Sequence, residues 1–158
     1  EPDIMNRPPR DVKAGIVSKE MLLRIIIVGV YILIGAYGLF QWELLAGHTI
    51  ESARTAAVNV VVMVEVFYLL NCRSLTHSMF KIGLFSNPIL LWGVLVMVAL
   101  QLLFNYVPAF HWVFESASTT PESWGKVLLI GFGLYLLVEY KKWLMRHAKA
   151  WWDARQNS

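Results

Sequence analysis

The sequence has little charge and a single cysteine. Only 16% of its 158 residues are charged while 57% are hydrophobic, a balance outside the range of ordinary soluble domains. Cys72 has no partner for an internal disulfide and stands in an apolar stretch, so it says nothing about redox compartment. The low charge and the mean hydropathy of +0.52 predict a membrane domain that crosses the bilayer several times.

The sequence also lacks the patterns that catalytic and metal sites require. Its four histidines, at positions 48, 77, 111 and 147, show no H-x-x-x-H spacing, so a zinc site is not expected. No recognisable serine hydrolase pattern occurs. The net charge of +3 is not gathered on a polar domain, as nucleic-acid binding would require. We therefore expect no catalytic residue, no bound cofactor and no nucleic-acid partner for this stretch of chain.

The first twenty residues are polar and contain three prolines. They do not form a signal peptide, because no apolar segment directly follows EPDIMNRPPR. Since the chain begins with Glu1 rather than methionine, we expect it to be a piece of a longer protein. Proline fixes φ and withholds a backbone donor, which predicts an extended or turn-rich strap over residues 1–20 with Ser18 capping the helix that follows.

Four apolar segments follow, each of a length that suits a membrane helix. Capping signals precede the last three: Thr49, Asn87 with Pro88, and Thr120 with Pro121. An aromatic interfacial link is expected from Pro108 to Phe114. The helices are predicted over about 21–45, 55–72, 88–106 and 124–140.

Lysine and arginine fall almost entirely on one side of this predicted arrangement. Twelve of them flank the side that holds both termini and the link after the second helix, whereas Arg54 and Lys126 lie on the other. Since these residues concentrate on the cytoplasmic side, both termini are predicted to be cytoplasmic. The predicted fold class is an all-α membrane protein, a bundle of four transmembrane helices: strap 1–20, four-span domain 21–144 and basic cytoplasmic tail 145–158.

Glu65 lies near the middle of the second predicted helix. A carboxylate at bilayer depth costs on the order of 2.5 to 3.5 kcal/mol, so it should face protein or a water-filled site. Two interpretations remain open: Glu65 is one of several oxygen ligands of a cation, or it is a structural or proton-carrying acid bonded to another helix. Tyr68, one turn later on the same face, either hydrogen-bonds the carboxylate or a bound water, or packs against a neighbouring helix.

Other polar and small residues in the apolar segments have simpler interpretations. Asn59 and Asn71 point about 120° to either side of Glu65 and are expected to hydrogen-bond neighbouring helices. Small residues in the first helix, among them Gly29, Gly35 and Gly38, would allow a neighbour to approach closely. Glu139, Lys141 and Lys142 are expected to form an interfacial charge group.

Three stretches resemble the P2-type cation-transporting P-type ATPases. EPDIMNRPPR resembles the proline-rich cytoplasmic segment between their sixth and seventh membrane helices. Glu65 with Asn71 six positions later resembles the eighth helix of the calcium pumps, and VEYKKWLMR resembles the end of the tenth. The resemblance covers the whole chain and implies helices seven to ten of such a pump.

The resemblance implies ATP-driven transport of a cation through an aspartyl-phosphate intermediate. Ca²⁺ is the first choice of cation, and sodium, protons and manganese remain open because ligands elsewhere decide selectivity. ATP and Mg²⁺ would serve only the full-length pump, because the D-K-T-G-T motif and the nucleotide site would lie upstream, so this fragment alone should be inactive. At the position of Glu65 the calcium pumps supply a carboxylate oxygen to the cation. Sodium–potassium pumps have a second acid where Tyr68 stands. Gln101 and Asn105 fall on the ninth helix, which is peripheral to the ion sites, and are expected to be structural.

The implied partners are the remaining membrane helices and the phosphorylation domain of the same pump, together with the lipid bilayer. Arg7 and Arg10 either touch that phosphorylation domain, as a coupling loop, or are solvated charges that set topology. The short links and tail favour a bacterial inner membrane. The competing hypothesis is a free-standing four-span structural or assembly protein without transport activity.

Overall fold

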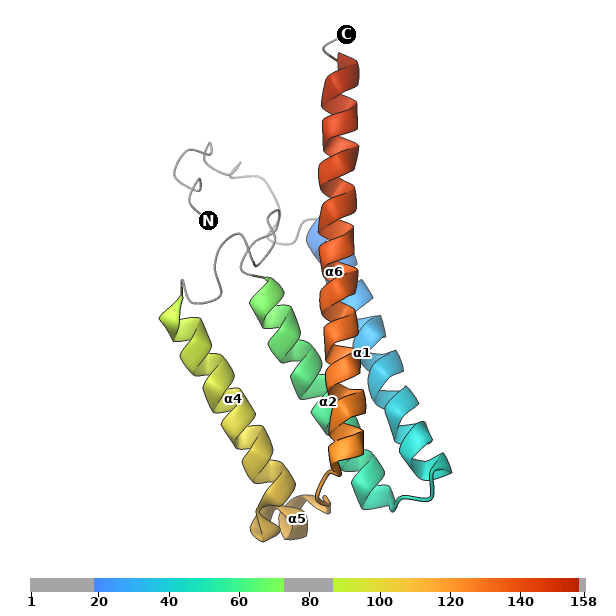
Figure 1. The fold of residues 1–158 in the computed structure, drawn as a ribbon, viewed down its shortest axis with the longest axis vertical. Coiled ribbons are helices and arrows are strands. Elements are labelled where there is room, and N and C mark those ends of the chain that lie inside the picture. The colour runs from blue at the N-terminus through green and yellow to red at the C-terminus, as the bar shows by residue number, and fades with distance from the viewer. Residues whose placement is uncertain (1–18, 73–86, 157–158) are drawn as a thin grey trace.

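The computed structural model describes residues 19–72 and 87–156. These form five helices and, within those two ranges, no strand (Figure 1). The predicted strap, the Ser18 cap and the link after the second helix lie outside the described residues. The helices are α1 (Lys19–Leu45), α2 (Ile50–Asn71), α4 (Pro88–Tyr106), α5 (Pro108–Phe114) and α6 (Pro121–Gln156).

The three predicted capping signals are confirmed. The side chain of Thr49 accepts a hydrogen bond from the Ser52 amide at 3.3 Å, and Asn87 accepts one from the Leu90 amide at 3.3 Å. The hydroxyl of Thr120 accepts one from the Ser123 amide at 3.2 Å. A side-chain acceptor at this position satisfies an amide that has no partner inside the helix, so these ends were readable from local sequence.

The largest differences from the predicted boundaries are at the start of α2, in the aromatic link and at the end of α6. Helix α2 begins at Ile50, directly after its cap and five residues before the predicted start, because polar residues such as Glu51 are compatible with a first helical turn. The aromatic link is itself a seven-residue helix, α5, which begins at Pro108. Helix α6 continues to Gln156, since no glycine or proline interrupts residues 134–156. The segment predicted as a separate tail therefore extends α6.

Three helical segments of the described chain are long and apolar enough to cross a membrane: Met21–Leu45, Ile50–Asn71 and Pro88–Tyr106. Helix α6 is not among them. Its apolar part lies between charged residues in its first turns, such as Lys126, and the charge group at Glu139. A fourth crossing and the cytoplasmic location of the termini therefore stay predictions.

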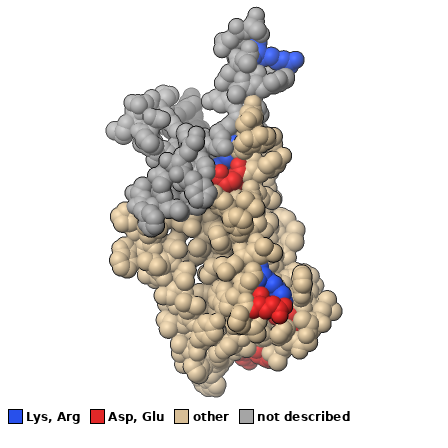
Figure 2. Space-filling view, viewed as in Figure 1, with Lys and Arg blue, Asp and Glu red and all other residues tan. Residues whose placement is uncertain are grey.

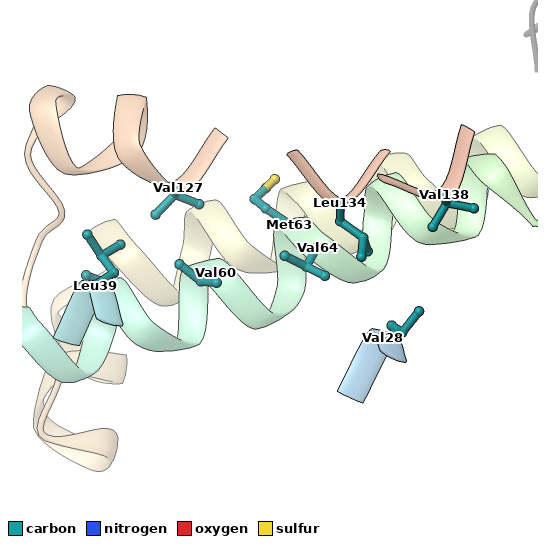
Figure 3. Packing of buried hydrophobic residues seen from close by; sticks show 9 residues of the cluster. Val28, Leu39, Val60, Met63, Val64, Val127, Leu134 and Val138 are labelled. Atoms are coloured by element: carbon teal, nitrogen blue, oxygen red, sulfur yellow. The ribbon is translucent and has the colours of Figure 1, made fainter. Parts of the chain in front are cut away.

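Helix α2 is the centre of the bundle. It packs mainly against α1 and α6, and less extensively against α4 (Figure 1). The apolar side chains at the junction of α1, α2 and α6 point toward one another (Figure 3). By contrast, the buried residues of α4 are Gln101 and Asn105, so polar contacts join α4 to the bundle. The apolar core consists of Val28, Leu39, Ala56, Val60, Met63, Val64, Val127, Leu134 and Val138.

Glycines let the helices approach closely at three points. A Cβ atom on Gly35 would lie 2.9 Å from Ile130, one on Gly131 would lie 2.6 Å from the Phe67 ring, and one on Gly133 would lie 2.5 Å from the Tyr31 hydroxyl. The prediction of close approach is thus confirmed for Gly35. For the glycines at positions 29 and 38, no atom of the described residues lies within 4 Å of such a Cβ, so close approach there stays a prediction.

Replacing Gly131 with alanine should destabilise the bundle, because the new methyl group would overlap the Phe67 ring. Overpacking of this kind costs about 1 to 3 kcal/mol. Gly125 is a matched control on the same helix, because nothing lies within 4 Å of its Cβ position. Gly125→Ala should be neutral or stabilising by up to about 1 kcal/mol. Thermal unfolding in detergent measures both, and equal midpoints would contradict the prediction.

Candidate functional site

Glu65 lies on a face of α2 that the other described helices leave open. Arg54, Val58, Glu65 and Leu69 are all exposed, and their spacing places them within about 60° of one another around the helix. Val58 and Leu69 are 41% and 37% exposed, so the face is mostly apolar on either side of the acid. We call these four residues the open stripe of α2. Glu65 is the acidic residue of this stripe.

No described residue forms a hydrogen bond or an ion pair with the Glu65 side chain. The described ranges also contain no group of three or more His, Cys, Asp or Glu side chains placed to hold a metal ion. A carboxylate in an apolar helix requires compensation. Whatever compensates Glu65, whether a cation, a proton or another helix, must therefore involve groups beyond the described residues.

Tyr68 is partly buried, in contrast to Glu65. Its ring packs against the apolar core, and its hydroxyl lies close to Arg24 of α1 and to Cys72. Packing against a neighbour is thus the interaction that the structure describes for this side chain. A hydrogen bond from Tyr68 to a bound water or to Glu65 stays a prediction.

Asn59 forms the centre of a buried hydrogen-bond network between α2, α4 and the link before α6. Its amide nitrogen donates to Asn105 Oδ1 at 2.9 Å and to Thr119 Oγ1 at 2.7 Å. Its amide oxygen accepts from Asn105 Nδ2 at 2.8 Å and from Gln101. Asn59, Asn105, Gln101 and Thr119 are all buried. The structural role expected for both asparagines and for Gln101 is confirmed.

Asn71 forms a second polar contact, between the end of α2 and α6. Its amide nitrogen donates to the Tyr135 carbonyl oxygen at 3.3 Å. Lys142 Nζ donates to the Asn71 carbonyl oxygen at 2.9 Å, to the Asn71 side-chain oxygen, and to Glu139 Oε1 at 3.3 Å. Lys142 is only 2% exposed. The expected charge group is present as the Glu139–Lys142 pair, and the Lys142 ammonium is buried between two helices.

A third polar cluster lies at the opposite end of the bundle and centres on Glu43, which is fully buried. Glu43 Oε1 accepts from Ser123 Oγ at 2.9 Å and from Lys126 Nζ at 3.2 Å. Glu43 Oε2 lies 3.5 Å from His48 Nε2. The cluster therefore ties the end of α1 and the α1–α2 link to the first turns of α6.

The Lys126 ammonium contacts two acidic side chains and an aromatic ring. Besides Glu43, its ammonium lies 3.0 Å from Glu122 Oε1 and 5.2 Å from the centre of the Trp42 ring. The hydrogen bond from Lys126, together with its charge, holds the pKa of Glu122 below its usual value. On the face drawn in Figure 2, charged side chains gather in a few small groups on a surface that is otherwise uncharged.

The sequence pattern does not single out Glu43, because an acid in the last turn of an apolar segment is a common interfacial residue. A usable signal is nevertheless present. Lys126 is one of only two basic residues on that side of the predicted membrane, and it stands in the first turns of another apolar segment. An acid and a lysine at matching depths of two helices are a candidate ion pair. Arg7 and Arg10, the predicted coupling residues, lie outside the described residues.

Residues 1–144 match a family model whose description is "Cation transporting ATPase, C-terminus". The chain belongs to this family. The predicted resemblance to the C-terminal region of cation-transporting ATPases is therefore confirmed.

Known proteins agree with this membership. The chain is 36% identical over 138 residues to "Probable cation-transporting ATPase F" of Mycobacterium tuberculosis, a match that covers 87% of the chain and 15% of the relative. It is 28% identical over 146 residues to "Calcium-transporting ATPase 1" of Yarrowia lipolytica, covering 92% of the chain and 16% of the relative. It is 33% identical over 116 residues to mouse "Calcium-transporting ATPase type 2C member 1", covering 73% and 13%.

The chain thus spans only about one seventh of the length of the relatives it matches. In this cation-transporting ATPase domain, the polar groups that hold the helices together are distinct from Glu65. The former are buried and hydrogen-bonded, whereas Glu65 stands on the open stripe.

Proposed function

We propose that this chain is the C-terminal membrane domain of an ATP-driven cation pump, and that Glu65 supplies one carboxylate oxygen to the pathway of the transported cation. The observation that carries the proposal is the position of Glu65 on the open stripe of α2, where no described residue compensates it. The family membership supports the pump, and the relatives' much greater length leaves room for further helices to cover the stripe.

Calcium is the cation that we propose. Ca²⁺ takes six to eight oxygen ligands, so Glu65 would contribute one ligand to a site completed by other helices of the pump. Two of the relatives are named calcium-transporting ATPases, which supports this choice. ATP and Mg²⁺ would bind elsewhere in the full-length protein, and this chain alone would not hydrolyse ATP.

For the topology we propose α6 as the fourth crossing, with both termini in the cytoplasm. The apolar core between α6 and α2 supports this, because the first half of α6 packs along α2 through Val127, Leu134 and Val138. The bacterial relative supports a bacterial inner membrane as the location. The proposed partners are the other helices and the phosphorylation domain of the same pump.

Replacing Glu65 with glutamine in the full-length pump tests the proposal. The substitution preserves size and removes the charge, so we expect the Ca²⁺ concentration for half-maximal ATPase activity to rise by about tenfold or more, equivalent to roughly 1.4 kcal/mol. Glu115→Gln is the control, because Glu115 is exposed and pairs only with Arg54 among the described residues. The same titration with Na⁺ and Mn²⁺ identifies the preferred cation. An unchanged Ca²⁺ dependence in Glu65→Gln would remove Glu65 from the ligands.

A further inference from the structure

Two polar contacts hold α2 on either side of Glu65. Asn59 stands six residues before Glu65 and Asn71 six residues after it. At about 100° per residue, the two asparagines point about 120° to either side of the acid. Asn59 bonds to α4 and the link before α6, whereas Asn71 bonds to α6. Glu65 is therefore directed toward the remaining third of the helix circumference.

Hydrogen bonds restrict this direction more sharply than the hydrophobic effect does. The hydrophobic effect that brings the valine and leucine side chains of α2 and α6 together is itself non-directional. Hydrogen bonds weaken steeply when the angle between donor and acceptor changes. The polar contacts at Asn59 and Asn71 therefore add a directional constraint on the rotation of α2 to the close packing of α2 against its neighbours.

Lys142 supplies the strongest part of the Asn71 contact. Its buried ammonium donates both to the carbonyl oxygen of Asn71 and to the side-chain oxygen of the same residue. That carbonyl belongs to the last residue of α2, where carbonyl oxygens lack a partner within the helix and attract a positive charge. Glu139, 3.3 Å away, balances the charge of the ammonium.

Joining two helices through a buried ammonium carries a large desolvation cost. An apolar side chain at the same position would contribute packing without the cost of removing a charge from water. The ammonium adds directional hydrogen bonds to the last residue of α2, and these restrict both the position of the helix end and the rotation of the helix about its axis. This difference favours a role beyond general stability.

We propose that Lys142 is a positioning residue for the cation pathway: through Asn71 it fixes the rotation of α2 that presents Glu65. This inference rests on the proposed function of Glu65. Lys142 itself touches no cation. A loss of its contact would let α2 turn about its axis and move the carboxylate away from the other ligands.

The test replaces Lys142 with methionine in the full-length pump, with Lys141→Met as the matched control. Lys141 precedes Lys142 on the same helix and is less buried. For Lys142→Met we expect the Ca²⁺ concentration for half-maximal ATPase activity to rise three- to tenfold, with the maximal rate within twofold of the unmodified pump. Lys141→Met should change neither quantity by more than twofold. An equal affinity in Lys142→Met and the unmodified pump would overturn the proposal.

A milder substitution keeps the proposal testable where Lys142→Met reduces the amount of folded pump. Asn71→Ala retains the backbone carbonyl but loses the side-chain contacts to Lys142 and Tyr135. It should raise the half-maximal Ca²⁺ concentration in the same direction. In the double variant the two shifts should not multiply, because both changes break one contact. Independent, multiplying shifts would show that Lys142 acts by another route.

A measurement of the accessibility of position 65 tests the positioning role of Lys142 separately from the role of Glu65 as a ligand. In a pump without other reactive cysteines, Glu65→Cys is labelled with a maleimide, with and without Lys142→Met. We expect at least a threefold change in labelling rate when Lys142 is replaced. If Glu65→Gln leaves Ca²⁺ affinity unchanged but the labelling rate still responds, the proposed function fails and the positioning role stands. If Glu65→Gln lowers affinity and the labelling rate does not respond, the positioning role fails.

Discussion

Replacing Asn59 with leucine is expected to lower the free energy of unfolding by about 2 to 4 kcal/mol. The asparagine donates two hydrogen bonds and accepts two more in a fully buried network. Leucine would leave the groups around Asn105 without these partners, and a buried polar group without a partner costs about 1 to 3 kcal/mol. Hydrogen bonds between membrane helices contribute less, about 0.6 kcal/mol on average. The expected loss is therefore well below the sum of the costs of the individual groups left without partners.

The effect of Asn59→Leu is measured as the shift in the unfolding midpoint of the chain in detergent, at fixed detergent concentration. Gln41→Leu provides the control. Gln41 also donates a side-chain hydrogen bond, at 2.8 Å to the Tyr37 hydroxyl, but this bond is exposed. Its loss should cost less than about 0.5 kcal/mol. Midpoints that fall equally in both variants would show that burial of the network contributes nothing.

A double-mutant cycle measures the coupling between Asn59 and Asn105. Asn105→Leu removes the chief partner of Asn59, with which it exchanges two hydrogen bonds. The variant with both leucines should be less destabilised than the sum of the single variants, since each single change already breaks the same bonds. Strict additivity would mean that the two asparagines stabilise the chain independently.

Local sequence signals predicted the helices well, because each depends on a few neighbouring residues. Thr49, Asn87 and Thr120 each accept a bond from an amide three residues later, a contact that forms wherever the helix begins. The bounds of α4 coincide with the predicted 88–106. The ends of α2 and α6 were less accurate, since charged residues such as Glu51 and Arg155 mark the edge of an apolar segment but do not end a helix.

The polar contacts were predictable in kind but not in partner. A polar residue in an apolar helix must find a hydrogen bond, which is enough to expect a structural role for Asn59. Its bond to Thr119, however, depends on how the link before α6 folds back onto α2, sixty residues away. The same holds for Lys142: its neighbour Lys141 has the same chemistry, and only the rotation of α6 decides which of them is buried.

Glu65 is a different case. The sequence predicted that its carboxylate must be compensated, but did not identify the group that compensates it. An acid at bilayer depth requires compensation, and the described helices of this chain leave that requirement unmet on the open stripe. Glu43 is also an acid in an apolar helix, yet one of its oxygens accepts hydrogen bonds from Ser123 and Lys126. The contrast between the two acids separates a carboxylate that holds this bundle together from one that faces outward.

Replacing Glu43 with leucine is the second change for which we expect a large effect, a loss of about 2 to 3 kcal/mol in the free energy of unfolding. Breaking a buried ion pair by removing one partner costs about 3 to 5 kcal/mol, because the remaining charge stays buried. Here the loss should be smaller. Lys126 keeps its contact with Glu122 at 3.0 Å and is 18% exposed, so its charge is not left alone.

Two further substitutions determine what Glu43 contributes. Glu43→Gln preserves an acceptor for Ser123 but loses the charge facing Lys126, so about half of the effect should remain. Glu115→Gln removes an acid from an exposed pair, in which Arg54 and Glu115 are 49% and 76% exposed, and should cost less than about 0.5 kcal/mol. Thermal unfolding in detergent at two salt concentrations measures all three variants. Salt should weaken only the exposed pair, because screening acts weakly on buried charges.

A stabilising effect of Glu43→Leu would contradict this expectation, and it has a clear physical meaning. It would show that removing the carboxylate from water costs more than its contacts with Ser123 and Lys126 return, as happens for some buried ion pairs. The cluster would then be retained for the geometry it imposes rather than for stability. Glu43 joins α1 to α6 at one end of the bundle, and Lys142 joins α2 to α6 at the other. That outcome would therefore mean that these buried charges fix how the helices are oriented, and do not add to the free energy of unfolding.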